Sequence, residues 1–589
     1  MSAIESNEYR KDIDGIRALA VLSVIFFHLG FLPNGYLGVD VFFAISGYLI
    51  TKKIFNDLQD NSFSLIDFYL RRARRILPLV IFTSLVALIT GFLVMLPDDF
   101  ENLCQSVFAT NLFSNNILLL ITSGNYWAIV NEYKPLMHTW SLGIEEQFYL
   151  IYPFIFLLFF KKNKNRLITV LLIFSFISLL LFFFGHDNVL KFYSIQYRFF
   201  ELSFGGLSFL LFDKIRFNKI FNPILIILVL IILLFDLKLP PEVILFLIVI
   251  FTVLLLVSGN KISGSSLLTG KVMVYIGKIS FSLYMWHQIV LAFSRYLITN
   301  NPNVGELFIY LLLIFGLSIF SYRWIETPFR NKKKISTKPF LLIIFSFSAV
   351  ACSVSFYLYS IGGIIRDVPE LEIKKSDIKF NHGSGKRNIH IEYNAKIYDL
   401  DKDFKSSDKT KVLVIGNSFA RDFANILLES HLNREIEISY IYDINNCENA
   451  KQRISEADYI FFSELQMKVY LSYRNKFNID TRKVWNVGTK NFGSNNGIYY
   501  NRKRDENYCK QRIKINHGYL ESNQVYNKQW GNRFIDLIGL VIDKEQTIPI
   551  FTDDCKFISQ DCEHLTKAGA VYFAKLLQLN FTKDSIVHQ

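Results

Sequence analysis

The chain has 589 residues, 51% of them hydrophobic, and a formal net charge of +13. This length predicts more than one domain. Because the composition is so apolar, much of the chain must lie in lipid or in a very large core. The positive excess is then typical of the cytoplasmic loops of a membrane protein, so we expect no nucleic-acid partner.

Apolar runs of helix length recur through roughly the first 360 residues. Several are shorter than the about 20 residues that a membrane span requires, so flanking residues must extend them. The sequence therefore predicts a polytopic α-helical membrane bundle of about eleven transmembrane helices, in contact with membrane lipids. The runs are Ile16–Leu32, Val39–Ile54, Leu77–Leu96, Ile144–Phe160, Leu167–Phe184, Phe199–Phe212, Ile220–Phe235, Val243–Val257, Ile279–Ile298, Leu307–Phe320 and Phe340–Ile361.

The distribution of Lys and Arg predicts how the chain crosses the membrane. If the N-terminus is cytoplasmic, the loops on that side are rich in Lys and Arg, whereas the long outer loop Pro97–Leu142 contains only Lys134. This is the positive-inside pattern. With an odd number of spans, everything after Ile361 lies outside the cytoplasm.

The first apolar run contains three ionisable residues, Asp14, Arg17 and His28. On a helix they share one stripe, with Arg17 and His28 about 16 Å apart along the axis. Ionisable side chains in a membrane helix face the protein interior and usually mark a pathway or a reaction site. The alternative is a helix-end ion pair and a histidine satisfied by a neighbouring helix.

Four arginines, Arg71, Arg72, Arg74 and Arg75, stand together at the cytoplasmic end of a span. They form either a topology anchor or a clamp for phosphate, because guanidinium forks match phosphate oxygens.

Further polar groups lie at or inside the later spans. His138 leads into a span that carries the paired carboxylates Glu145 and Glu146. Arg198 and Glu201, three residues apart on one helix face, most simply form a buried ion pair. The segment SFSLYMWHQ places His287 inside a span.

Together these segments resemble the acyltransferase-3 family of membrane O-acyltransferases. The resemblance implies a ten-helix bundle that takes an acyl group, usually acetyl, from cytoplasmic acyl-CoA. By position, Arg17 and His28 are the key residues of the first span, and Arg72 and Arg75 match an RxxR pair linked to the acyl donor. The matching motifs, in the family's order over residues 9–332, are IDGIRALAVLSVIFFH, GYLGVDVFFAISGYLIT, FYLRRARRILP, HTWSLGIEEQFYLIYP, ISFSLYMWHQ and YRWIETPFR.

This resemblance predicts acetyl-CoA as the acyl donor and no metal. A neutral imidazole can act as a base or accept an acyl group, so His28 is the catalytic candidate of the membrane half. The candidate donor-binding residues are Arg17, Arg71, Arg72 and Arg75. Other candidates for the membrane site are Asp14, Asp40, His138, Glu145, Glu146, Arg198 and Glu201.

The chain becomes polar after about residue 366, and short β-rich runs then alternate with helical stretches. This alternation predicts an extracytoplasmic α/β domain with a parallel sheet. The β-rich runs are KVLVIG, REIEISYIYD, ADYIFFSE, KVWNVG and TIPIFTDD. We therefore divide the chain into a membrane domain (1–335), an additional transmembrane helix (336–362), an extracytoplasmic linker (363–410) and an α/β domain (411–589).

The segment KVLVIGNSFARDFANIL reads as a strand, a tight turn and a helix that begins near Ser418. A nucleophilic serine at such a turn is a recurrent device. Near the C-terminus, Asp561 and His564 are three residues apart, and an Asp that orients the imidazole deprotonating Ser418 would complete a triad. The alternative for Ser418 is an ordinary helix cap.

As an ordered pair these two segments resemble the SGNH hydrolase family, over about residues 411–580. Such domains are commonly fused behind an acyltransferase-3 half through one extra span, which Phe340–Ile361 resembles. Asn491, in GTKNFG, occupies the place of the family's oxyanion-hole asparagine. Two departures are the Gly-Asn-Ser block, where Gly-Asp-Ser is usual, and the lack of a separate glycine block for the oxyanion hole.

Four of the six cysteines, Cys447, Cys509, Cys555 and Cys562, lie in this outer part, where they could form two disulfides. Sequence alone does not decide the pairing; a Cys555–Cys562 bond would close a tight loop.

The combined hypothesis is an O-acyltransferase of the bacterial cytoplasmic (inner) membrane that moves acetyl from cytoplasmic acetyl-CoA to a hydroxyl of a surface glycan. The acceptor we favour is lipopolysaccharide O-antigen or another lipid-linked polysaccharide, with peptidoglycan or capsule next. The alternatives of another class are a transporter or flippase with an outer binding module, and an outer esterase.

Overall fold

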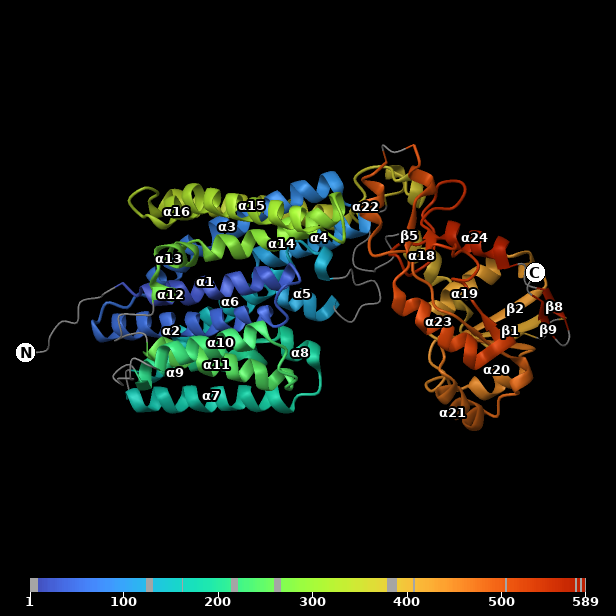
Figure 1. The fold of residues 1–589 in the computed structure, drawn as a ribbon, viewed down its shortest axis with the longest axis horizontal. Coiled ribbons are helices and arrows are strands. Elements are labelled where there is room, and N and C mark those ends of the chain that lie inside the picture. The colour runs from blue at the N-terminus through green and yellow to red at the C-terminus, as the bar shows by residue number, and fades with distance from the viewer. Residues whose placement is uncertain are drawn as a thin grey trace, which may run out of the picture. The chain divides into compact units, whose positions relative to one another are not determined.

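The structure is a computed structural model, and it describes residues 9–122, 131–160, 163–212, 221–258, 266–378, 389–405, 408–503, 506–577, 580–582 and 585–587. The chain divides into two compact units (Figure 1). Unit 1 comprises residues 1–93, 102–295 and 301–357, and unit 2 comprises residues 94–101, 296–300 and 358–589.

Helices account for nearly all of the regular structure in unit 1, with some helix ends belonging to unit 2. They are α1 (Lys11–His28), α2 (Gly38–Gln59), α3 (Leu65–Val94), α4 (Pro97–Asn111), α5 (Asn115–Thr122), α6 (Trp140–Phe159), α7 (Lys164–Phe184), α8 (Asn188–Tyr193), α9 (Ile195–Phe212), α10 (Phe221–Leu234), α11 (Pro241–Ser258), α12 (Ser266–Thr269), α13 (Lys271–Lys278), α14 (Ser280–Leu297), α15 (Val304–Ser321), α16 (Thr327–Arg330) and α17 (Thr337–Ser360).

Each of the eleven predicted apolar runs coincides largely with a helix. Within the described residues, six helices are long and apolar enough to cross a membrane. Helices α1 and α2 are not among them because both carry several charged residues, such as Asp14 on α1 and Asp40 on α2. The figure of eleven spans therefore stays a prediction. The six are Leu65–Val94, Met137–Phe159, Lys164–Phe184, Pro241–Ser258, Val304–Arg330 and Thr337–Ser360.

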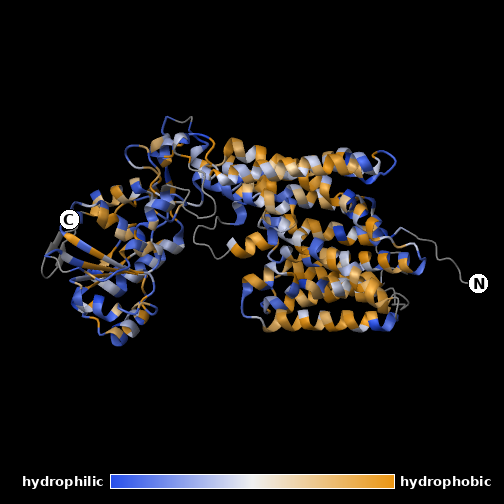
Figure 2. Cartoon of the chain, turned by 180° about the vertical axis from the view of Figure 1, so that it is seen from behind, coloured by the Kyte–Doolittle hydropathy of each residue, from blue (hydrophilic) through white to orange (hydrophobic). Residues whose placement is uncertain are grey.

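The outer faces of unit 1 are apolar, as the hydropathy colouring of its helices shows (Figure 2). Phe176 on α7 is 60% exposed and Phe345 on α17 is 76% exposed. An apolar surface of this extent is stable against lipid rather than water. Unit 1 is therefore the multi-pass membrane part of the protein.

Two glycines allow α2 and α9 to pack at close range. A Cβ atom at Gly47 would lie 1.7 Å from the carbonyl oxygen of Leu202, and one at Gly205 would lie 1.9 Å from that of Ala44. Small residues of this kind let membrane helices approach backbone to backbone. The close approach fixes the position of α9 along α2. It thereby also fixes how the polar residues of the two helices lie opposite one another.

Unit 2 is built on a five-stranded parallel sheet with the order β2-β1-β3-β4-β6. The two remaining strand pairs are antiparallel. The strands are β1 (Thr410–Ile415), β2 (Ile436–Ile441), β3 (Tyr459–Ser463), β4 (Val484–Val487), β5 (Arg512–Lys514), β6 (Phe534–Ile535), β7 (Thr547–Pro549), β8 (Asn580–Thr582) and β9 (Ser585–Val587).

Helices cover both faces of this sheet (Figure 1). Val412 and Val414 of β1 belong to one buried cluster, with residues of α19 and α24, whereas Leu413 and Ile415 belong to another, with residues of α20 and α21. Because both faces are buried, the strands are almost uniformly apolar. The helices are α18 (Ile389–Ala395), α19 (Ser418–Glu429), α20 (Ala450–Glu456), α21 (Met467–Phe477), α22 (Asn496–Tyr500), α23 (His517–Trp530) and α24 (Lys567–Leu577).

The structure corrects one predicted strand and shows a helix within the predicted linker. The run TIPIFTDD forms β7, which pairs with β5, and the fifth strand of the parallel sheet is the short β6. The predicted linker 363–410 contains α18, and its residues 379–388 and 406–407 lie outside the described part.

One disulfide joins Cys509 to Cys555, across 46 positions of chain. Cys447 and Cys562 are free thiols, so the considered Cys555–Cys562 bond is not formed. The buried Cys562 thiol instead donates to the side-chain oxygen of Asn496 at 3.5 Å.

Candidate active site

Ser418 stands at the first position of α19, directly after the turn that ends β1. Gly416 adopts φ +137° in this turn, a conformation that side-chain-bearing residues rarely adopt. Asn417 caps the helix, its side-chain oxygen accepting the backbone N–H of Phe419 at 3.0 Å. Strand β1 lies where the sheet order reverses, the usual position of ligand sites in parallel sheets.

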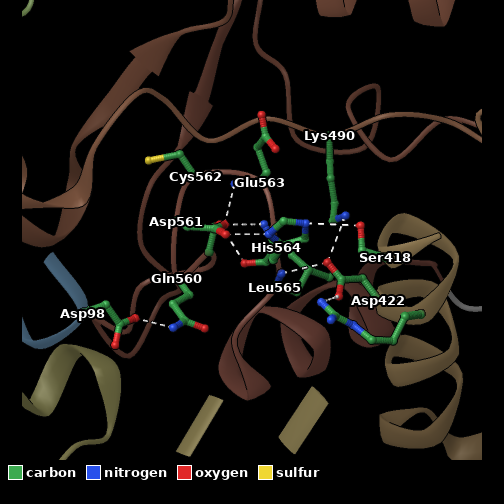
Figure 3. Close-up of polar contacts among 12 residues, drawn as sticks. Asp98, Ser418, Asp422, Lys490, Gln560, Asp561, Cys562, Glu563, His564 and Leu565 are labelled. Carbon is green, nitrogen blue, oxygen red and sulfur yellow. Dashed lines mark hydrogen bonds and ion pairs between the residues drawn. The ribbon is translucent and has the colours of Figure 1, made fainter. Parts of the chain in front are cut away.

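Ser418, His564 and Asp561 form a hydrogen-bonded chain (Figure 3). The Nε2 atom of His564 lies 3.2 Å from Oγ of Ser418, and its Nδ1 atom lies 2.5 Å from Oδ2 of Asp561. The backbone N–H of His564 also donates to Oδ1 of Asp561 at 2.7 Å. This is the order of contacts in which an imidazole can take a proton from a serine hydroxyl.

A second carboxylate, Asp422, supports the loop that carries His564. It lies one turn after Ser418 on α19 and accepts the backbone N–H of Leu565 at 2.9 Å. Burial by itself raises the pKa of Asp422, but Lys490, Arg421 and His564 together hold it below its ordinary value. Asp422 is therefore a buried anion, and sequence spacing did not single it out.

Asn491 lies in the loop after β4, and its amide binds within that loop. Its Nδ2 atom donates to the carbonyl oxygen of Gly493 at 3.2 Å, and its Oδ1 atom accepts the Gly493 N–H at 3.2 Å. The predicted oxyanion donor thus already has a local partner, and its role stays a prediction.

Unit 1 contains a cavity lined by three of the predicted donor-binding arginines, Arg17, Arg72 and Arg75. The guanidinium of Arg72 lies 5.2 Å from the ring centroid of Tyr149, another lining residue. Ser46, Ser141, Glu145 and Tyr284 also line the cavity. The walls thus combine several positive charges with hydroxyl groups, which suits phosphate oxygens.

The remaining predicted residues near this cavity have separate partners. Arg71 forms an ion pair with Asp57 at 3.1 Å and is not among the lining residues. Arg17 lies 3.8 Å from Asp14, whose carboxylate also accepts the hydroxyl of Tyr9.

The two glutamates of α6 differ in their surroundings. Glu145 faces the cavity and accepts the hydroxyls of Ser46 and Tyr149. Glu146, the next residue, is half-buried.

Asp40, Arg198 and Glu201 form one buried ionic cluster between α2 and α9. Arg198 lies 2.6 Å from Asp40 and 2.9 Å from Glu201. Its guanidinium also lies 5.5 Å from the ring centroid of Trp140. The predicted Arg198–Glu201 pair is present, and Asp40 joins it because α2 and α9 are close-packed.

Three histidines from different elements meet in unit 1. The ring of His287 on α14 lies 5.3 Å from that of His28 on α1 and 5.2 Å from that of His138, measured between centroids. The Nδ1 atom of His287 donates to the carbonyl oxygen of Tyr284 at 2.6 Å, which leaves Nε2 as the lone-pair nitrogen.

Tyr284 connects the cavity and the histidines. It lines the cavity, and its ring lies 5.2 Å from His138 and 5.4 Å from His287. The candidate site residues predicted from sequence did not include His287. An ionisable residue inside an apolar span was the sequence feature that could have identified it.

A helical bundle with an apolar exterior, an arginine-lined cavity and a buried histidine cluster defines a multi-pass membrane protein with charged and polar side chains in its interior. The chain belongs to the acyltransferase-3 family: residues 10–359 match this family, described as an acyltransferase domain. The first part of the family resemblance is thereby confirmed.

Several curated proteins are similar to this chain. O-acetyltransferase OatA of Staphylococcus aureus strain NCTC 8325 / PS 47 is 31% identical over 355 residues, which cover 56% of this chain and 58% of the relative. "Putative O-acetyltransferase SAS0844" of strain MSSA476 is 31% identical over 384 residues, covering 60% of this chain and 63% of the relative. The chain thus spans less than two-thirds of the length of these relatives. No solved structure matches it.

Proposed function

We propose that the protein is an O-acetyltransferase of the bacterial cytoplasmic membrane, which transfers acetyl from cytoplasmic acetyl-CoA to a hydroxyl of a cell-surface glycan. Its unit 2 would be an SGNH-like domain outside the cytoplasm. The observation that carries the proposal is the chain from Ser418 through His564 to Asp561, held in a protein whose other half belongs to an acyltransferase family.

In the membrane half, Arg17, Arg72 and Arg75 would hold the phosphates of acetyl-CoA. An imidazole nitrogen of His28 then attacks the thioester carbonyl. The C–S bond breaks, the acyl group is carried on nitrogen, and the proton that the imidazole loses goes to the sulfur, so that CoA leaves as the thiol. If His28 acts only as a base, it takes the proton of the acceptor hydroxyl and gives it to the CoA sulfur, and the acyl group passes directly from CoA to that acceptor.

In the outer domain, Ser418 takes the acyl group. His564 removes the proton from Oγ as the Oγ–C bond forms. The bond between the acyl carbon and its previous carrier then breaks, the carrier takes up the proton from His564, and the acyl-serine ester results. A glycan hydroxyl then gives its proton to His564 and attacks the ester, which frees Ser418. Asp561 holds the imidazole in the required tautomer through its bond to Nδ1.

The acceptor we favour is the lipopolysaccharide O-antigen, with peptidoglycan or capsule as the alternatives. The names of the staphylococcal relatives state O-acetyl transfer without an acceptor. Chemical release of acetate from each purified glycan class of a deletion strain and its parent identifies the acceptor.

The decisive test of the outer half is Ser418→Ala in a deletion strain. We expect the variant, at normal abundance in the membrane, to restore no glycan O-acetylation, whereas Ser455→Ala, at an exposed position on α20, restores it fully. Wild-type acetylation by Ser418→Ala would contradict the mechanism.

The membrane half is tested with inside-out vesicles supplied with labelled acetyl-CoA. We expect label to reach the protein or the glycan in wild-type vesicles and not in His28→Ala vesicles. A transporter or flippase would show no dependence on acetyl-CoA.

A further inference from the structure

Lys490 is a buried cation next to the Ser418–His564 pair. Its side chain is 1% exposed and its Nζ atom lies 2.9 Å from Oδ2 of Asp422. The same ammonium lies 3.8 Å from the ring centroid of Phe419, the residue after the serine, and that ring lies 5.9 Å from the ring of His564. In Figure 3 the ends of Lys490 and Ser418 point to the same side of the imidazole.

Lys490 and a second buried cation lie beside the same carboxylate. Arg421 also pairs with Asp422, at 3.0 Å, so two buried cations share one carboxylate. Among the residues that the structure describes, no other carboxylate forms an ion pair with Lys490. A buried ammonium is costly to desolvate, so its position beside the Ser418–His564 pair favours a role in the chemistry of that pair.

Two neutral groups that could stabilise an oxyanion already have partners within their own segments. The backbone N–H after a serine nucleophile is a common oxyanion donor, but the N–H of Phe419 donates to Asn417 at 3.0 Å. The amide of Asn491 donates to Gly493 at 3.2 Å. Lys490, which precedes Asn491 in the sequence, places a positive charge near Ser418 instead.

We propose that Lys490, rather than Asn491, stabilises the oxyanion that forms when Ser418 attacks an acyl carbonyl. This rests on the proposed nucleophilic role of Ser418. As the Oγ–C bond forms, the serine proton moves to Nε2 of His564 and the carbonyl electron pair moves onto oxygen, facing the ammonium. Lys490 keeps its protons throughout, and collapse of the intermediate expels the leaving group.

The test measures how fast a fluorophosphonate labels Ser418 in the purified full-length protein in nanodiscs. Labelling forms an O–P bond, breaks the P–F bond and needs neither acyl-CoA nor glycan. We expect Lys490→Met to slow labelling by about 10²- to 10³-fold, as loss of an oxyanion donor does. Lys490→Arg should stay within about tenfold of the wild type, and Asn491→Ala within about threefold, because the first keeps the charge and the second keeps Lys490.

Labelling of Lys490→Met at the wild-type rate would overturn the inference, as would a larger loss in Asn491→Ala. If Lys490→Met does not fold, as judged by thermal unfolding, Lys490→Arg and Asn491→Ala still decide between the two residues.

A purely structural role is separated by a double variant. If Lys490 acts only by holding Asp422, adding Lys490→Met to Asp422→Asn causes no further loss, and that result overturns the inference. If it acts on the oxyanion, the added substitution slows labelling by a further about tenfold or more.

The two proposals fail in different ways. If the wild-type protein is not labelled at Ser418, both the nucleophilic role of Ser418 and the oxyanion role of Lys490 are refuted. In a different outcome, labelling depends on Lys490 but the Ser418→Ala variant still acetylates glycan fully in cells. That outcome refutes the proposed function and leaves the oxyanion role of Lys490 supported.

Discussion

The Nε2 atom of His564 lies 3.2 Å from Oγ of Ser418, although 146 positions of chain separate the two residues. Ser418 is held by the turn after β1, and His564 by the loop before α24. Helices α19 and α24 pack in the same buried cluster on one face of the sheet, which brings the two loops together. The two residues therefore meet because α19 and α24 pack on the same face of the sheet.

The first prediction concerns the orienting acid. Asp561→Asn removes the charge that holds the imidazole tautomer, so turnover should fall by about 10³- to 10⁴-fold. The measurement is hydrolysis of p-nitrophenyl acetate by the purified protein. Glu563→Gln is the matched control, because the neighbouring carboxylate binds the hydroxyl of Tyr519 instead. Equal losses in both variants would contradict the assignment.

The second prediction separates two adjacent arginines. Arg72 lines the cavity, whereas Arg71 pairs with Asp57. Arg72→Gln should raise the KM for acetyl-CoA by about tenfold or more, because a charge-assisted bond to phosphate contributes roughly 1.5–3 kcal/mol. Arg71→Gln should change the KM by less than about twofold. Initial rates of thiol release in vesicles report both, and a larger effect at Arg71 would refute the cavity as the donor site.

The third prediction concerns His287. Its ring lies 5.3 Å from that of His28 and its Nδ1 atom is engaged with Tyr284, so we expect Nε2 to relay the proton that His28 loses on acylation to the CoA sulfur. His287→Gln should lower acyl transfer by about 10²-fold with little change in the KM for acetyl-CoA, because the cavity arginines are intact. Trp286→Phe, at the adjacent residue whose indole donates to Ser321, serves as the control. Full activity of His287→Gln would show that the cluster is only structural.

The fourth prediction is a pH dependence of stability. Burial raises the pKa of Asp99 to about 6, with added repulsion from Asp561 and partial relief from hydrogen bonds with Asn495 and Tyr296. An unfolded Asp titrates near pH 3.9, so the folded chain holds this proton more tightly. The stability that this proton contributes is full below about pH 4 and is lost as the pH rises through about 6, by at most about 3 kcal/mol.

Asp99→Asn should flatten this dependence, because an amide does not ionise. Thermal unfolding of the purified protein between about pH 4 and pH 7 measures the slope. Asp60→Asn, at an exposed position, should leave the slope unchanged. Identical slopes for Asp99→Asn and the wild type would contradict the prediction.

Local sequence signals carried much of the fold. The apolar runs, the strand before Gly416 and the Asp561/His564 spacing all depend on neighbours within a few residues, and the structure has helices, β1 and the hydrogen-bonded pair at those places. Short strands are harder, because β6 has only two residues and its pairing with β4 is decided by distant chain. The strand TIPIF was for the same reason placed in the wrong sheet.

By itself, the sequence determined the two-part organisation, the family of the membrane half and the residues Arg17, Arg72, His28 and Ser418 as candidates. Periodicity, charge bias and short motifs are local, so they can be read along the chain. Only the tertiary structure decided that His287 meets His28, that Arg71 turns to Asp57 and that Lys490 and Asp422 lie together beneath the serine. Each of these depends on which helices and loops pack together, and packing depends on the whole chain.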